Sequence, residues 1–528
     1  MKQFFAAVAA VVASAHLPRV DAQFQQACAA LASRLTIPNT TIASTSFVAA
    51  GTNLTFPTVD ASCDTPSQVV SSDICRVVLT VATSSRSSTA VEVWLPSNWT
   101  GRFLSTGNGG IGGCIQYPDV DYGSSLGFAT TGSDNGHTGQ NGTLFLNNIE
   151  VVTDFSWRSL VTSAVVGKQI THEFYGKPHH KSYYFGCSTG GRQGWKMAQD
   201  FPDVFDGVVA GAPVFDWDNL MSWGGMFFPI IVKAGPDGYP PPSTWPVIDA
   251  ELLKQCDDID GAVDGILEDP SLCNFRPETI ICSPGDNSSS CITAKQAETV
   301  RALFQPLVVN GTSLYPARQY GPGFVAIIFE VFSSSQFFIM DNWYRFAVFN
   351  DPTFDTSDLT PEQIIFATNL NPANINTWSG NLAKFRDYGA KILHYHGQQD
   401  EQVSSANSNR YYELVSQTMG LPSSALDEFY RFFRISGMMH CGGGPGATFI
   451  GNAEASVASL DPDENVLMAM VRWIEEGIAP ETITGTAFVN QTQVLGVDFK
   501  RAHCRYPYRN VYTGKGDVKD PASWKCIV

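Results

Sequence analysis

Strand-like and helical apolar patterns alternate in two separate parts of the chain. In the first part, apolar runs that end in polar or glycine-rich turns predict strands at 91–99, 101–110, 126–137, 181–187 and 205–213. Helical spacing between them predicts helices at 157–176, which ends at a glycine, and at 192–202. This alternation is typical of an α/β sheet.

The alternation stops near residue 214 and resumes in segments at 390–400, 409–420, 428–444 and 464–477. The residues between are rich in Trp, Phe, Tyr, Pro and Cys and lack regular spacing. An interrupted sheet predicts an inserted domain, so we assign 23–213 and 386–528 to the sheet domain and 214–385 to a lid. We expect the lid above the C-terminal strand ends, where open α/β sheets bind ligands.

The first 22 residues have the form of a secretory signal peptide, with Lys2 before a short apolar stretch that ends in small residues. Cleavage after Ala15 or after Ala22 fits this form. The stretch is too short to span a membrane, and no later apolar run is long enough, so we expect a secreted, extracellular protein.

Two further features agree with export. The twelve cysteines are an even number, which allows six disulfides in an oxidising compartment. Seven N-x-S/T sequons predict glycosylation, at Asn39, Asn53, Asn98, Asn141, Asn287, Asn310 and Asn490. The net charge of −17, without any basic run, argues against nucleic acid or an anionic membrane as a partner.

Residues 186–190 have the G-x-S-x-G form of a nucleophile elbow. A strand precedes this pattern and a helix follows it, which is the context that such an elbow requires. The turn would expose the Ser188 hydroxyl and direct the Thr189 amide toward a developing oxyanion. Glycines 109 and 110, after an earlier strand, are candidates for the second amide donor, and Gly110 is preferred.

A serine nucleophile needs a base and a group that orients the base, in the chain order Ser, Asp or Glu, His. Four histidines follow Ser188, namely His394, His396, His440 and His503. His394 and His396 lie inside an apolar strand, where packing is the simpler role, and His503 lies in the tail. His440 lies in a glycine-rich loop after a strand and is therefore the expected base.

Asp400 is the first carboxylate of the loop after the preceding strand, and it is the expected orienting group, with Glu401 as its competitor. Cys187 directly precedes Ser188, and Cys441 directly follows His440. A disulfide between these cysteines would bring their Cα atoms to about 5.5 Å and would hold Ser188 within hydrogen-bonding range of His440.

The stretch 256–273 is an acidic loop with glycine turns between two cysteines. Calcium takes six to eight oxygen ligands, which such loops supply through carboxylates and backbone carbonyls. The predicted side-chain ligands are Asp257, Asp260 and Asp264, and the predicted carbonyl ligands are Ala262 and Ile266. The spacing differs from an EF-hand, and a solvated acidic turn is the alternative. No organic cofactor is indicated.

Together these motifs resemble the tannase and feruloyl esterase family of secreted α/β hydrolases, over nearly the whole mature chain. The resemblance rests on "GCSTGG", "HGQQD", "MMHCGGG" and the "DxxDGxxDGI" loop. It implies an α/β-hydrolase fold with a lid, Ser188, His440 and Asp400 as the catalytic triad, and a structural calcium in the lid. It also implies the disulfides Cys187–Cys441, Cys28–Cys75, Cys63–Cys114, Cys256–Cys273, Cys282–Cys291 and Cys504–Cys526.

The resemblance further implies a carboxylic ester hydrolase acting on phenolic-acid esters. Feruloyl and related hydroxycinnamoyl esters of plant cell-wall polysaccharides such as xylan are the first expectation, and galloyl esters, the substrates of tannases, are the alternative. Aromatic residues at 217–229 and 331–346 line the acyl pocket or, for most of them, form the core of the lid. A non-catalytic binding module and a peptidase are more remote readings. The oligomeric state is left open.

Overall fold

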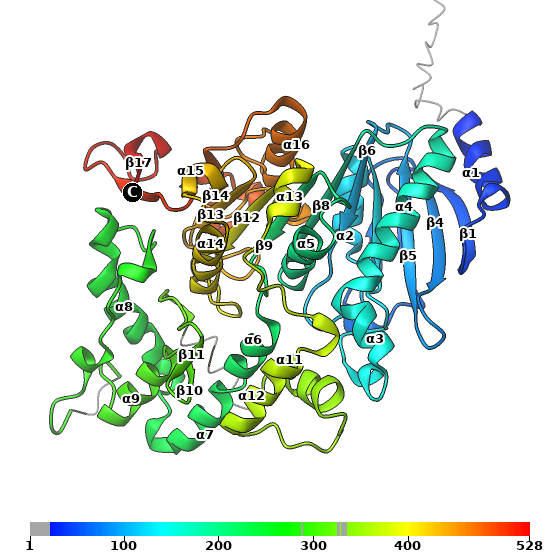
Figure 1. Cartoon of the computed structure of the whole chain (residues 1–528). Helices are drawn as coiled ribbons and strands as arrows, with labels where there is room; N and C mark the ends of the chain where they lie inside the picture. The colour runs from blue at the N-terminus through cyan, green and yellow to red at the C-terminus, as the bar shows by residue number, and fades with distance from the viewer. Residues whose placement is uncertain (1–21, 287–288, 325–327, 329–334) are drawn as a thin grey trace, which may run out of the picture.

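The computed structural model describes residues 22–286, 289–324, 328 and 335–528 (Figure 1). Apart from Ala22, the predicted leader lies outside these residues, as does the sequon at Asn287. Within the described residues, nine strands form one sheet. In spatial order they are β1 (Thr40–Val48), β4 (Ile74–Ala82), β5 (Ser88–Pro96), β7 (Phe128–Ser133), β6 (Arg102–Thr106), β8 (Lys181–Cys187), β9 (Gly207–Gly211), β12 (Lys391–Gly397) and β13 (Tyr430–Ile435).

The sheet is mixed. The six strands from β7 to β13 in spatial order run parallel, whereas β1, β4 and β5 pair antiparallel with their neighbours. The α/β prediction is confirmed, but the sequence analysis missed β1 and β4. Most side chains of β1 are small, polar and at least partly exposed, which is why its apolar signal is weak.

Neighbouring residues in the central strands enter different cores, because successive side chains of a strand point to opposite faces. In β9, Val208 and Ala210 join one core and Val209 joins the other. The first face is covered by α1 (Ala22–Arg34), α4 (Ser159–Tyr175), α5 (Thr189–Asp200), α13 (Ala383–Tyr388) and α14 (Ala406–Met419). The second is covered by α2 (Tyr117–Ser125) and α16 (Val466–Glu476).

The predicted helix at 157–176 is α4, which ends where the sequence indicates. Gly176 has a φ of 69° and donates its N–H to the carbonyl of His172, which caps the last turn. A turn of π-helix, 154–158, leads into α4. Outside the main sheet and the inserted layer, the described strands form three two-stranded pairs: β2 (Asn53–Thr55) with β3 (Ser67–Val69), β14 (Thr482–Phe488) with β15 (Val497–Cys504), and β16 (Arg509–Tyr512) with β17 (Trp524–Ile527).

Between β9 and β12, which are parallel neighbours, the chain leaves the sheet and forms a separate layer of helices, seen below the sheet in Figure 1. Its elements are α6 (Trp217–Gly224), α7 (Phe227–Gly238), α8 (Trp245–Cys256), α9 (Ala294–Leu303), the hairpin β10 (Leu307–Val309) and β11 (Thr312–Tyr315), α11 (Phe338–Asn342) and α12 (Pro361–Leu370).

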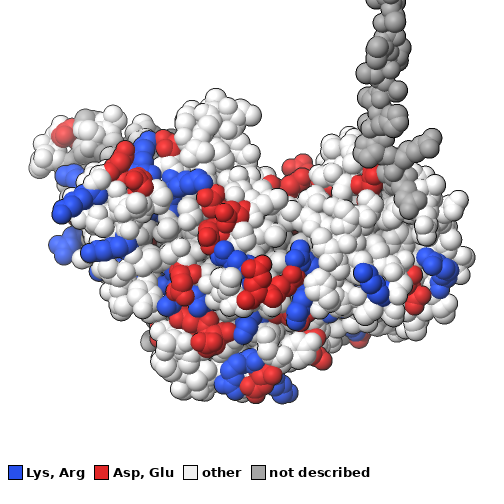
Figure 2. Space-filling model, turned by 90° about the horizontal axis from the view of Figure 1, so that it is seen from above, with Lys and Arg blue, Asp and Glu red and all other residues white. Residues whose placement is uncertain are grey.

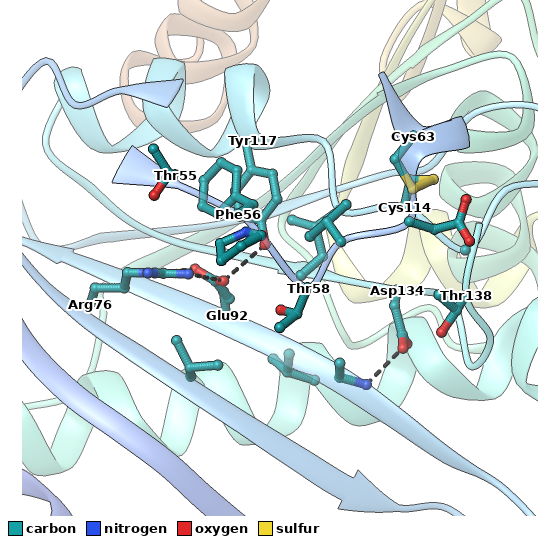
Figure 3. Close-up of a pocket in the computed structure, with 18 of the residues that line it drawn as sticks. Thr55, Phe56, Thr58, Cys63, Arg76, Glu92, Cys114, Tyr117, Asp134 and Thr138 are labelled. Carbon is teal, nitrogen blue, oxygen red and sulfur yellow. Dashed lines mark hydrogen bonds and ion pairs between the residues drawn. A yellow bond between two sulfur atoms is a disulfide. The ribbon is translucent and has the colours of Figure 1, made fainter. Parts of the chain in front are cut away.

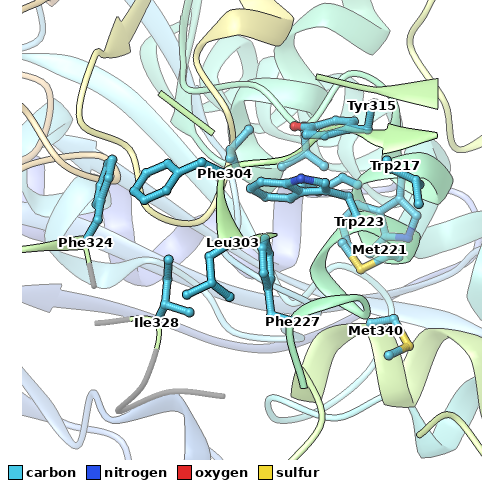
Figure 4. Close-up of a cluster of buried hydrophobic side chains, with 14 of the residues drawn as sticks. Trp217, Met221, Trp223, Phe227, Leu303, Phe304, Tyr315, Phe324, Ile328 and Met340 are labelled. Atoms are coloured by element: carbon cyan, nitrogen blue, oxygen red, sulfur yellow. The ribbon is translucent and has the colours of Figure 1, made fainter. Parts of the chain in front are cut away.

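This layer has its own hydrophobic core (Figure 4). Trp217, Trp223, Phe227 and Trp343, from the two aromatic stretches of the sequence analysis, are almost completely buried in it. Residues 331–334 of the second stretch lie outside the described part. The described aromatic residues of these stretches therefore serve mainly to hold the lid together.

Hydrogen bonds fasten the lid to the sheet domain at several places, two of which lie close to the ends of the central strands. The buried Arg192 of α5 donates to the carbonyls of Ser156 and Ile375, and Lys196, one turn later, donates to those of Asn374 and Asn376. On the other side, the Ser404 hydroxyl donates to the carbonyl of Ala317 over 2.6 Å. The second contact joins the lid to the loop that follows β12.

A buried carboxylate, Glu92 on β5, organises the antiparallel side of the sheet (Figure 3). Arg76 of β4 donates to both of its oxygens, and Tyr117 of α2 donates to Oε1 over 2.9 Å. Phe56 stacks on the Tyr117 ring with centroids 3.7 Å apart. Because a buried charge is tolerated only when paired and hydrogen-bonded, this cluster fixes the helix, the strands and the Phe56 loop together.

All six predicted disulfides are present. Four of them close loops of fewer than 50 residues, and the bridge Cys187–Cys441 closes one with a sequence separation of 254. Among the described helices, none combines the length and the apolar character needed to cross a bilayer.

Candidate active site

Ser188 lies at the sharp turn between β8 and α5. Its φ of 64° and ψ of −122° place it in a region that non-glycine residues rarely occupy, and its N–H donates to the carbonyl of Gly211 on β9. Gly190 packs against the backbone of the glycine loop, where a Cβ would lie 3.1 Å from the carbonyl oxygen of Asn108. A small residue is required at this position for the elbow to close.

His440 lies in the loop after β13 and reaches Ser188, which follows β8, across the ends of the intervening strands β9 and β12. Its Nε2 is 2.9 Å from the Ser188 Oγ, and its Nδ1 is 2.7 Å from Oδ2 of Asp400. A carboxylate can only accept, so Nδ1 carries the proton and Nε2 is free to accept from the serine hydroxyl. The structure therefore brings together the three residues that the sequence analysis selected.

Asp400 and Glu401, the two candidates for the orienting group, have different partners. Asp400 faces the imidazole ring, whereas Oε2 of Glu401 accepts the backbone N–H of His440 over 3.0 Å. Asp400 is itself held by its loop, since Oδ1 accepts the N–H groups of Gln402 and Val403 over 2.8 and 2.7 Å. The ring is oriented by Asp400, and Glu401 holds the backbone behind it.

The electrostatics of this cluster favour an ionised Asp400 and a basic His440. Burial by itself would raise the pKa of Asp400, but the charge of His440 and the hydrogen bonds from His396 and His440 outweigh burial and hold that pKa far below its ordinary value. For His440, burial would lower the pKa, but the carboxylates of Asp400 and Glu401 outweigh burial, so its pKa is raised. The imidazole is thus a stronger base than a free histidine.

The disulfide Cys187–Cys441 joins the residue before the nucleophile to the residue after the base, with 6.0 Å between the Cα atoms. Cys441 has a φ of 59°, so both loops that this bridge joins contain a non-glycine residue in the left-handed region. The Cys441 carbonyl accepts from the Asn452 side chain over 2.8 Å. The bridge and this hydrogen bond fix the His440 loop against the elbow.

The amide groups selected for the oxyanion lie next to Ser188. Thr189 is the first residue of α5, so its N–H has no acceptor within the helix. The Thr189 hydroxyl donates to the carbonyl of Gly110 over 2.6 Å, which ties the glycine loop to the elbow. Within the described chain, no backbone hydrogen bond uses the N–H of Gly109 or of Gly110. Both remain candidates for the second donor.

A pocket of about 420 Å³ opens over Ser188 and His440. Most of the surface that lines it is apolar, and Ile339 of the lid is the only described residue of the two aromatic stretches that lines it. The polar side chains of this wall are Asn108, Gln116, Asp119, Gln402, Asn452 and Glu454. Burial, together with the nearby Glu454 carboxylate, raises the pKa of Asp119 to about 7. The carboxyl group of Asp119 is therefore partly protonated near neutral pH.

The other histidines of the second half lie away from Ser188. His503 is buried on β15, where its Nε2 is 2.9 Å from the carbonyl of Ala447. His394 and His396 are fully buried on β12. His396, however, also contacts Asp400, with 3.1 Å between Nε2 and Oδ2. Sequence reasoning missed this contact, because a spacing of four residues at the end of a strand does not indicate that the chain turns back.

The acidic loop 256–273 is closed by the disulfide Cys256–Cys273 and faces Arg501. Arg501 donates to Asp264 and to Glu268, while the carboxylates of Asp257 and Asp260 contact loop N–H groups. Within the described residues, no three His, Cys, Asp or Glu side chains form a metal-binding group by themselves. Only Asp264 and Glu268 of these four carboxylates pair with the guanidinium, and the remaining negative charge fits a divalent cation that also takes backbone carbonyl ligands.

Residues 75–527 match the family model described as tannase and feruloyl esterase. The protein named "Probable feruloyl esterase B-2" of Aspergillus terreus is 50% identical over 516 residues, which cover 98% of this chain and 97% of that protein. The crystal structure of feruloyl esterase B from Aspergillus oryzae has a TM-score of 0.92 at 43% identity and covers 96% of this chain and all of that one.

The tannin acyl hydrolase of Aspergillus niger has the same fold, with a TM-score of 0.74 at 23% identity over 94% of each chain. The α/β-hydrolase fold expected from the sequence is thus confirmed.

Replacing Glu401 by Gln tests the electrostatic origin of the His440 basicity. The base acts only when it is unprotonated, so a raised pKa means that kcat/KM for ester hydrolysis declines as the pH falls through values above 6.5. Glu401→Gln keeps an acceptor for the His440 N–H but removes the charge, so the acid limb should move to lower pH by about half a unit. Glu362→Gln, at an exposed site on α12, is the control. If the acid limb of kcat/KM does not move in Glu401→Gln, the charge of Glu401 does not raise the pKa of His440.

Removing the disulfide beside the triad should affect catalysis beyond its effect on stability. The double variant Cys187→Ala/Cys441→Ala should lose about a hundredfold in kcat/KM at temperatures where it is folded, because small displacements of the base from the nucleophile are costly. Cys504→Ala/Cys526→Ala is the matched control, which should lower Tm but leave kcat/KM of the folded enzyme unchanged. Equal rates in the two double variants would show that the first bridge only stabilises the fold.

Proposed function

This chain belongs to the tannase and feruloyl esterase family, and on that basis we propose that it is a feruloyl esterase that hydrolyses feruloyl and related hydroxycinnamoyl esters of plant cell-wall polysaccharides. Membership of the family makes it a carboxylic ester hydrolase. The observation that carries the proposal is the continuous hydrogen-bond path from Asp400 through His440 to Ser188 at the base of a pocket. The near-full-length similarity to proteins named feruloyl esterase B supports the acyl group.

The proposed reaction has two steps. Ser188 Oγ attacks the ester carbonyl while Nε2 of His440 takes its proton, and the amides of Thr189 and Gly110 receive the negative charge of the tetrahedral intermediate. His440 returns the proton to the leaving alcohol, and the acyl group stays on Ser188. His440 then takes a proton from a water molecule as the water attacks the acyl-enzyme. His440 passes this proton to Ser188 Oγ as the acyl bond breaks, which releases the phenolic acid and restores the serine.

A tannase activity, the cleavage of galloyl esters, is the alternative that a specific observation favours. Several amide and carboxyl side chains contribute polar groups to the described pocket wall, although most of the wall's surface is apolar. Such a wall can bond several hydroxyls of an acyl ring, and a galloyl ring carries more of them than a feruloyl ring. Sites that bond a substrate hydroxyl discriminate strongly against analogues that lack it.

The proposed location is extracellular, with N-linked glycans. Of the six sequons in the described residues, the asparagines of five are exposed and Asn141 is half-buried. Figure 2 shows acidic and basic side chains interspersed over the face seen from above, with no long basic stripe on that face. The formal charge of −17 and the six disulfides also fit an exported enzyme that acts on neutral sugar esters.

We propose further that the acidic loop holds a structural calcium. Asp257, Asp260 and Asp264, with the carbonyls of Ala262 and Ile266, would bind it, and the ion would offset the excess of carboxylates around Arg501. The loop contacts the sheet domain through Arg501 of β15, so the ion would stabilise the junction between lid and sheet rather than take part in the reaction.

The substrate proposal is tested by comparing methyl ferulate, methyl caffeate, methyl p-coumarate and methyl gallate, with the Ser188→Ala variant beside the native enzyme. We expect the hydroxycinnamates to have the higher kcat/KM, and the variant to lose about 10⁴-fold or more while its circular dichroism is unchanged. A preference for gallate would identify a tannase. Turnover of none of the four esters would exclude both activities.

Calcium removal should destabilise the protein without changing the triad. Chelation is expected to lower Tm by about 5 °C, and added Ca²⁺ but not Mg²⁺ should restore it, because a ligand that binds only the folded state stabilises it. Asp260→Asn should abolish the calcium response. Asp258→Asn, an exposed position in the same loop, is the control and should keep it. Identical melting with and without chelator would refute the calcium site.

A further inference from the structure

A series of hydrogen-bonded, buried side chains runs from Tyr430 on the edge strand β13 to the carboxylate of Asp400. The Tyr430 hydroxyl on β13 is 3.0 Å from Nδ1 of His394, whose Nε2 is 3.0 Å from Oγ of Ser408 on α14. The same Oγ is 2.7 Å from Nδ1 of His396, whose Nε2 is 3.1 Å from Oδ2 of Asp400. All five residues are 0 or 1% exposed.

The end of this series nearest the active site has only one possible polarity. Nε2 of His396 faces Oδ2 of Asp400 and the carbonyl of Val403, each at 3.1 Å, and both of these are acceptors. Nε2 must therefore carry a proton and donate it. In the neutral ring Nδ1 is then an acceptor, which obliges Ser408 to donate its hydroxyl proton to His396.

The hydrogen bonds at the Tyr430 end of the series also donate in the direction of Asp400. Once the Ser408 proton is committed to His396, Nε2 of His394 must donate to Ser408, and Nδ1 of His394 accepts from the Tyr430 hydroxyl. Burial, with a smaller effect of His396, holds the pKa of His394 well below its ordinary value, so this ring has one proton to give. The reverse direction would leave the Tyr430 O–H without an acceptor, since His394 is its only hydrogen-bond partner in the described chain.

The series ends on a carboxylate whose acceptor positions are filled. Oδ1 of Asp400 accepts two loop N–H groups, and Oδ2 accepts both His440 Nδ1–H and His396 Nε2–H. We propose that His396 is a positioning residue for ester hydrolysis, whose Nε2–H fixes the orientation of Asp400 and shares Oδ2 with His440, so that Asp400 stays ionised without binding the His440 proton too tightly. This inference rests on the proposed function and concerns the same site.

Because His396 and His440 share Oδ2 of Asp400, the loss of the His396 donor should change the pKa of His440 in a defined direction. Without His396, the charge on Oδ2 would be less dispersed and would attract the His440 imidazolium more strongly, which raises the pKa of His440. The acid limb of kcat/KM should then move to higher pH. The other ionisable groups facing this cluster are Glu401 next to His440, and Tyr315 and Arg318 of the lid, which act electrostatically on Asp400; the substitutions below leave all three in place.

The test compares three variants of the full-length enzyme on methyl ferulate, or on whichever ester the native enzyme prefers. His396→Leu removes the donor, whereas His396→Gln can place an amide N–H near the position of Nε2. Tyr430→Phe is the matched control, because it deletes one hydrogen bond at the opposite end of the same series without opening a cavity. Thermal unfolding is recorded for each, to separate catalytic losses from unfolding.

We expect His396→Leu to lose about tenfold in kcat/KM and its acid limb to rise by about half a pH unit or more. His396→Gln should recover most of both, and Tyr430→Phe should keep the native limb even where its Tm falls. If the acid limb of kcat/KM in His396→Leu stays in place or moves to lower pH, the proposal is overturned. Gln and Leu variants with equal defects would also overturn it.

Should His396→Leu fail to fold, the native enzyme supplies the decisive measurement. Nitrogen-15 NMR of histidine-labelled protein, with His396→Gln used to assign the resonance, should show a His396 ring protonated at Nε2 and unprotonated at Nδ1. A proton on Nδ1 alone would overturn the proposal. Because these readouts concern pH and tautomer, they are distinct from the Ser188→Ala experiment, whose failure would instead remove the assignment of the nucleophile.

Discussion

The catalytic geometry of this enzyme depends on one covalent constraint, the disulfide between Cys187 and Cys441. It joins two loops that are 254 residues apart in sequence, at the residues adjacent to the nucleophile and the base. Ser188 and Cys441 both have positive φ values, a conformation that costs energy and persists only where the surroundings enforce it. The bridge holds both residues in this conformation, and the hydroxyl of Thr189 ties the glycine loop, through the carbonyl of Gly110, to the same turn.

The sequence predicted that Ser188, Asp400 and His440 come together, because each occupies a position that the fold itself defines. Ser188 follows β8 in a recognisable turn, and Asp400 and His440 follow β12 and β13, which lie beyond β9 in the same parallel sheet, so that all three residues lie at the C-terminal ends of parallel strands. The adjacent cysteines added an independent distance restraint. Alternation of apolar runs likewise predicted the parallel strands and α4, because strands buried on both faces produce a strong apolar signal.

What the sequence did not predict depends on packing that leaves little periodic signal. The half-exposed β1 consists mostly of small polar residues without regular alternation and is recognisable mainly through its pairing with β4. The contact of His396 with Asp400 arises because the chain turns back after β12, where the Asp400 N–H donates to the carbonyl of Gly397. In an extended continuation, two residues four positions apart would lie far beyond hydrogen-bonding distance.

The location of the His396 series explains how a loop carboxylate can be held as firmly as a core residue. His394 and His396 stand on β12, Tyr430 on β13 and Ser408 on α14, so the donors are fixed by two paired strands and a packed helix rather than by loops. Precise sites need such support, since a carboxylate held only by its own loop can rotate. Asp400 is held on one oxygen by its loop and on the other by the sheet, and this leaves a single orientation in which it can meet His440.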